Sequence, residues 1–134
     1  MSEPDVTTGA GYSVSSLDRL GSGYGFRKIR KPMGVTAFGA NGVVLPPDYP
    51  TRNHFHDEQE ELYFVHKGSI EFTFGDGTRH RVDEGGLVWV AADTVRQLRS
   101  VGETDAVYVA VGGKDGYVPH DGHEAPGGDV PPAS

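Results

Sequence analysis

The stretch that decides the fold is RNHFHDEQEELYFVHKG, residues 52–68. In extended chain, successive side chains point to opposite faces, so His54 and His56 share one face about 6.6 Å apart. The acidic residues 57–60 are polar enough to turn the chain, and the apolar residues 62–65 predict a returning antiparallel strand. Glu61, the first residue of that strand, would then face the two histidines.

These three side chains predict a metal site. Two neutral imidazoles and one carboxylate form the ligand set of facial Fe(II) sites, and the same set suits a catalytic zinc. We therefore expect one divalent ion bound by His54, His56 and Glu61. The alternative is that the histidines lie in a loop beside acids that only solvate a turn.

Composition limits the class of protein. The chain has 134 residues, 20 glycines and 9 prolines, which favours one turn-rich β domain over a helical one. It has no cysteine, so disulfides, thiolate metal sites and a cysteine nucleophile are excluded. A formal charge of -7 argues against nonspecific binding to nucleic acid or to a membrane surface. Because the N-terminus is polar and no apolar run reaches membrane-spanning length, we expect a cytoplasmic protein.

Turn signals divide the chain into three parts. Residues 1–25 lack sustained periodicity and predict a flexible arm, residues 26–112 predict a barrel, and the Gly- and Pro-rich residues 113–134 predict a tail that cannot order itself by apolar burial. The fold class is all-β, a closed or nearly closed antiparallel barrel or jelly roll. The expected strands are residues 34–38, 42–45, 54–56, 62–65, 69–74, 78–82, 87–90, 95–101 and 106–111.

The spacing around the histidines resembles the first motif of the cupins. In that motif His-x-His is followed by three or four residues, a Glu, six residues and a Gly. Here the matching positions are His54, His56, Glu61 and Gly68. The resemblance covers roughly residues 34–112 and implies a jelly-roll barrel with one divalent ion, Fe(II) or Mn(II) ahead of Zn(II) or Ni(II).

The second cupin motif is degenerate in this chain. Its Gly, Pro-x-Gly, His and Asn positions fall here on Gly85, Ala91, Asp93, Arg96 and Ser100, so only the first glycine survives. Arginine stands where the family's third imidazole would be, and a guanidinium has no lone pair for a metal. A register shifted by one residue would instead bring the Gln97 carbonyl to the ligand position, which would turn the strand inside out.

Arg96 and Tyr63 are the candidate catalytic and substrate-binding residues. Arg96 is expected to point into the barrel, where two arrangements are open. Glu61 either turns to pair with Arg96 in a metal-free site, or a substrate carboxylate bridges the metal and the guanidinium. Tyr63 shares the Glu61 face and could serve as a hydrogen-bond donor or acid, or only as a core aromatic.

The resemblance implies a small-molecule function. The first hypothesis is a mononuclear metal-dependent enzyme, most often a dioxygenase-like oxidoreductase acting on a small, carboxylate-bearing organic substrate, with isomerase and lyase chemistry behind it. The alternative is a noncatalytic small-ligand-binding cupin, with or without metal. His120 and His123 in the tail are candidates for a lid-like or intermolecular metal contact. We also expect a homodimer, because β edges around residues 26–45 need a cover that the arm could supply.

Overall fold

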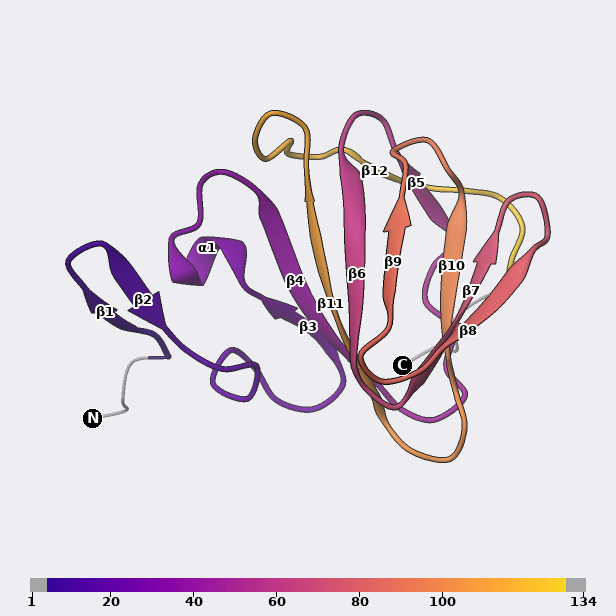
Figure 1. Ribbon diagram of the computed structural model, residues 1–134, viewed down its shortest axis with the longest axis horizontal. Helices are drawn as coiled ribbons and strands as arrows, with labels where there is room; N and C mark the ends of the chain where they lie inside the picture. Colours follow the sequence, from indigo (N-terminus) through magenta and orange to yellow (C-terminus); the bar gives the residue numbers. More distant parts are fainter. Residues whose placement is uncertain (1–4, 130–134) are drawn as a thin grey trace.

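The computed structural model describes residues 5–129, which fold as two facing five-stranded antiparallel sheets (Figure 1). One sheet has the strand order β3-β4-β11-β6-β9 and the other β12-β5-β10-β7-β8. The bounds in the first sheet are β3 Gly25–Lys28, β4 Gly39–Leu45, β6 Glu60–Lys67, β9 Leu87–Val90 and β11 Ala106–Gly113. In the second they are β5 His54–His56, β7 Ser69–Phe74, β8 Arg79–Val82, β10 Arg96–Val101 and β12 Gly122–Glu124. The expected all-β barrel of jelly-roll type is confirmed.

Alternation along the strands builds the core. The inward side chains of both sheets form one buried cluster, and the charged Arg96 is fully buried near it. The cluster consists of Val43, Leu45, Tyr63, Val65, Ile70, Phe72, Val90, Leu98, Ala106 and Tyr108. Because side chains in a strand alternate with period two, the same pattern that fills the core also orders the site at one end of the barrel.

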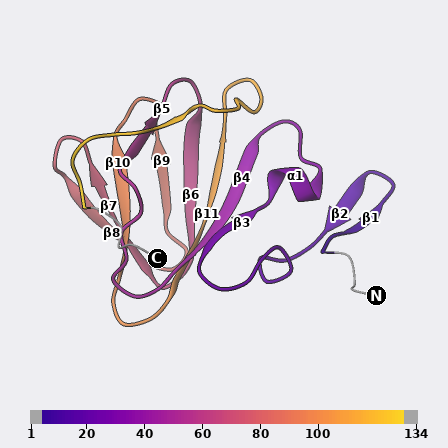
Figure 2. The ribbon, with the colours of Figure 1, turned by 180° about the vertical axis from the view of Figure 1, so that it is seen from behind.

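Two segments near the N-terminus differ from expectation. The arm contains a hairpin, β1 Thr7–Gly9 and β2 Tyr12–Val14, which projects to one side of the barrel in both views (Figure 1 and Figure 2). The strand expected at residues 34–38 is wrong, because a one-turn helix, α1 Arg30–Met33, precedes it and Gly34 ends that helix in a left-handed conformation with φ 79°. None of the helices in residues 5–129 is long and apolar enough to cross a membrane.

The C-terminal tail is ordered as far as residue 129, contrary to the composition argument. Strand β12 pairs antiparallel with β5, and the tail lies across the barrel mouth (Figure 1). Polar and backbone contacts hold it, among them Ala125 N–H donating to the Asn53 carbonyl at 2.9 Å and an ion pair between Arg99 and Asp129. The buried side chain of Ala125 adds a small apolar contribution to these contacts.

Candidate metal centre

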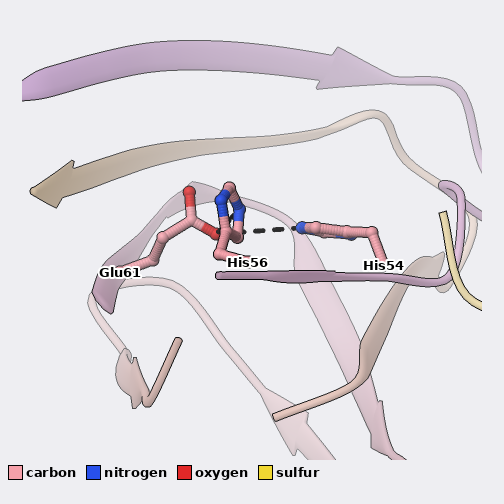
Figure 3. Close-up of side chains that lie close together, drawn as sticks. All are labelled: His54, His56 and Glu61. Carbon is pink, nitrogen blue, oxygen red and sulfur yellow. Dashed lines mark ion pairs between the residues drawn. The ribbon is translucent and has the colours of Figure 1, made fainter. Parts of the chain in front are cut away.

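The structure brings the three predicted ligands together. His54 and His56 project from β5, the turn at residues 57–59 reverses the chain, and Glu61 projects from β6 toward both rings (Figure 3). Their candidate ligand atoms all lie within 4.8 Å of one another. Glu61 Oε1 is 3.1 Å from His56 Nε2 and 3.8 Å from His54 Nε2.

The ring orientations suit metal binding. His54 Nδ1 lies 3.1 Å from the Arg52 carbonyl oxygen, which can only accept, so the Nδ1 proton is held there and Nε2 keeps its lone pair. The Asp121 carboxylate, 3.6 Å from His56 Nδ1, would hold the same tautomer once a cation takes the Nε2 lone pair, whereas without a cation Gln59 Nε2 at 3.4 Å favours the other tautomer. Two lone pairs and a carboxylate that face one point fit a divalent cation.

Glu61 is ionised. Burial raises the pKa of its carboxyl, but the contacts with His54, His56 and Tyr63 outweigh burial and hold the pKa well below its usual range. The contacts to His56, Tyr63 and Arg96 all converge on Oε1. The second oxygen, Oε2, takes part in none of these contacts.

Arg96 faces the interior, as expected, and most of its donors are bonded to protein. It is 0% exposed, and its Nη2 donates to Glu61 Oε1 at 2.5 Å. Its Nη1 donates to the Thr94 carbonyl at 2.8 Å and the Ala92 carbonyl at 3.1 Å. The pairing of Glu61 with Arg96 is therefore present. The role of Arg96 in binding substrate stays a prediction.

Tyr63 supports the same carboxylate. Its hydroxyl donates to Glu61 Oε1 at 2.7 Å and accepts from Arg96 Nε at 3.3 Å. Burial, followed by the nearby Glu61 charge, raises the pKa of the Tyr63 hydroxyl well above its usual value, so the hydroxyl keeps its proton. Tyr63 is a buried core aromatic whose hydroxyl positions Glu61. Its contact with substrate stays a prediction.

Gln97 is directed away from the site. Its Nε2 donates to the Thr51 carbonyl at 2.8 Å and the Asp129 carbonyl at 2.6 Å, while Oε1 accepts from Asp129 N–H at 2.8 Å. The alternative in which Gln97 is a fourth ligand is therefore wrong. Neighbours in a strand face opposite ways, so with Arg96 inside, Gln97 must face the tail.

The tail supplies residues that sequence reasoning missed. The Asp121 carboxylate accepts the backbone N–H of Gln59 at 2.8 Å and that of Glu58 at 3.1 Å, which fixes the turn between the ligand strands. Burial raises the pKa of Asp121, but these backbone hydrogen bonds and the charge of His56 lower it overall. Gly122 lies against His56, since a Cβ there would be 3.3 Å from the ring's Cε1. No local pattern marks either residue, because both contacts join segments more than 60 positions apart.

The two tail histidines differ in position. His123 Nε2 lies 2.5 Å from the Asp57 carboxylate on the turn. This contact holds the tail to the turn and directs the ring away from the candidate metal ligands. His120 lines a cavity of about 200 Å³ beside the metal site, together with His56 and Glu61. A larger open groove of about 480 Å³ lies between β9 and the β7–β8 turn, but its lining includes none of the predicted ligands. The smaller cavity is the candidate binding space, because His56 and Glu61 line it.

Comparisons with known proteins agree with this architecture. A cupin protein from Bacteroides fragilis superposes with a TM-score of 0.67 at 19% identity, over 78% of this chain and 85% of that one. A sugar phosphate isomerase of the cupin superfamily from Silicibacter pomeroyi gives 0.64 at 22% identity, over 75% of this chain, which spans 64% of that one. A polyketide cyclase from Streptomyces resistomycificus gives 0.58 at 24% identity, over 65% and 62% of the two chains.

At such identities these solved structures are evidence of a shared fold. No curated protein sequence matched the chain. The model of the cupin domain family matches residues 42–112, more than half of the sequence, and this range contains His54, His56 and Glu61. The chain belongs to the cupin domain family.

Proposed function

We propose that this cupin binds one divalent metal ion through His54, His56 and Glu61 and acts on a small organic molecule at that ion. The observation that carries the proposal is the convergence of both Nε2 atoms on the ionised Glu61, with the His54 Nδ1 proton held by the Arg52 carbonyl. Three protein ligands leave coordination positions open. A bound Fe(II) or Mn(II) would supply Lewis-acid and redox chemistry, so dioxygenase-like oxidation is the reaction we propose.

Other residues of the chain would position the ligands and line the cavity. Arg96 and Tyr63 hold Glu61 Oε1 and keep the carboxylate charged. Asp121 fixes the turn that carries Gln59, and the tail closes one side of the 200 Å³ cavity.

Metal content tests the proposal. Protein purified without an affinity tag and then incubated with Mn(II) or Zn(II) should retain about one ion per chain after gel filtration. His54→Ala and His56→Ala should lose it, since two ligands bind far more weakly than three. The matched control is His66→Ala, an exposed histidine on β6, which should keep the ion. Full retention in all three variants would place the ion elsewhere and contradict the assignment.

A second candidate is a metal-free small-ligand-binding cupin. The ion pair between Arg96 and Glu61 favours it, because the guanidinium already neutralises the carboxylate that a metal would use. Wild-type protein that binds no ion under the conditions above would select this candidate over the metal enzyme.

A homodimer also belongs to the proposal. Strands β6 and β9 expose an apolar outer face in which Leu62 pairs with Trp89 and Phe64 with Leu87, the latter 65% exposed. Exposed apolar patches of this kind mark contact surfaces. Light scattering should give about twice 14.3 kDa, and Leu87→Glu should lower the mass toward 14.3 kDa. Phe38→Glu, an exposed aromatic outside this face, is the control, and a monomeric wild type would contradict the dimer.

A further inference from the structure

The cavity beside Glu61 has a composite wall. Barrel residues of β4, β6 and β11 form one side, and the tail forms the other. The tail contributes Tyr117, Val118, His120, Asp121 and Gly122. Arg30 of α1 lies over the Tyr117 ring at 3.9 Å, which anchors this wall to the barrel sheet. The cavity is thus a formed space next to two of the three metal ligands.

Gln59 lines this cavity and also carries an unsatisfied polar atom. The residue is 8% exposed, and its Oε1 is buried without a hydrogen-bond partner. Its carboxamide packs beside Gly112, where a Cβ would be 3.8 Å from Gln59 Cδ. Buried polar atoms are nearly always hydrogen-bonded, and one left alone costs about 1–3 kcal/mol. An orphaned carboxamide in a cavity next to a metal site indicates that a ligand completes its bonding.

The other half of the carboxamide contacts a metal ligand. Gln59 Nε2 lies 3.4 Å from His56 Nδ1, an arrangement in which Nδ1 must accept. With an ion on Nε2, the His56 ring carries its proton on Nδ1 and can only donate there. The oxygen and nitrogen of a carboxamide have nearly the same shape, so turning the group over lets Oε1 accept from Nδ1 and places the NH₂ group toward the cavity.

Both neighbouring carboxylates already accept hydrogen bonds from other donors. Glu61 Oε1 already accepts from Tyr63 and Arg96, and Asp121 accepts from the backbone of Glu58 and Gln59. We propose that Gln59 is a specificity-determining residue that presents a hydrogen-bond donor to the cavity when a metal is bound. The substrate class that fits is a small molecule with a carboxylate or carbonyl oxygen. This inference rests on the proposed metal site and adds a hydrogen-bond donor for the substrate beside that site.

Acetate is the probe, and zinc is the ion for NMR because it is diamagnetic. Acetate should bind Zn(II)-loaded wild-type protein and bind metal-free protein at least about tenfold more weakly, a difference of roughly 1.4 kcal/mol as expected for one hydrogen bond. Gln59→Glu offers only acceptors, so it should weaken acetate binding by at least about tenfold. The same variant should keep zinc, since a carboxylate also accepts from His56 Nδ1.

Two further measurements test whether the Gln59 carboxamide itself contacts acetate. The side-chain NH₂ signals of Gln59 should shift on addition of zinc and shift again on addition of acetate. Glu58→Gln, an exposed change in the same turn, should bind zinc and acetate as the wild type does. If Gln59→Glu binds zinc and acetate as the wild type does, the inference about Gln59 is wrong and the metal site still stands. The same holds if wild-type protein binds acetate equally well with and without zinc. Failure of wild-type protein to bind zinc would overturn the metal site and this inference with it.

Discussion

Replacing Arg96 with leucine should lower the free energy of unfolding by about 3–5 kcal/mol, because it leaves a buried carboxylate without its partner. Arg96 is fully buried and bonds to Glu61, to Tyr63 and to the carbonyls of Ala92 and Thr94. Leucine can replace none of these donors. The loss should therefore exceed that of an ordinary large-to-small core change of similar position.

Urea denaturation of metal-free protein in EDTA measures this loss. Arg81→Leu is the control, since Arg81 is an exposed arginine of the same sheet whose ion pair with Asp83 is screened by solvent and contributes little to stability. The double variant Arg96→Leu/Glu61→Leu should recover part of the stability, because it removes the stranded charge as well. Equal losses from Arg96→Leu and Arg81→Leu would show that the buried network contributes no more than a surface pair.

The barrel and the ligand trio could be predicted from the sequence because both follow from local rules. Period-two alternation fixes which side chains face the core, and a turn of fixed length between His56 and Glu61 fixes their approach. The interior orientation of Arg96 followed from the same parity. The same alternation turns Gln97 away from the interior once the inward orientation of Arg96 is known.

The remaining features depend on contacts between distant segments. Asp121 and Gly122 lie in a stretch whose composition resembles a disordered tail, yet Asp121 is ordered by backbone donors of Glu58 and Gln59. Arg96 Nη1 donates to backbone carbonyls of the loop at residues 91–94. The positions of these carbonyls do not depend on residue type. Local patterns carry no information on where backbone carbonyls point after folding. The tail and the backbone partners of Arg96 were therefore beyond sequence reasoning.

Acid should destabilise the metal-free protein steeply below about pH 4, and Glu61 should account for much of the slope. The pKa of Glu61 in the folded chain lies well below its unfolded value of about 4.3. Its contribution to stability is therefore complete above the unfolded pKa and is lost as the pH falls from there toward the folded pKa. One such group adds up to about 1.4 kcal/mol per pH unit to the slope.

The variant Glu61→Gln separates this group from the other acids whose pKa is lowered, Asp121 among them. At pH 7 it should be the less stable protein, because Arg96 keeps its charge without a carboxylate. As the pH falls below 4, the difference in unfolding free energy between wild type and variant should shrink, because only the wild type loses an ionised Glu61. Glu103→Gln, which removes an exposed carboxylate from the β10–β11 turn, should keep the wild-type profile. A constant difference between wild type and Glu61→Gln from pH 7 to pH 2 would mean that Glu61 is not held ionised by its neighbours, and the arrangement of donors around Oε1 would then not govern the site.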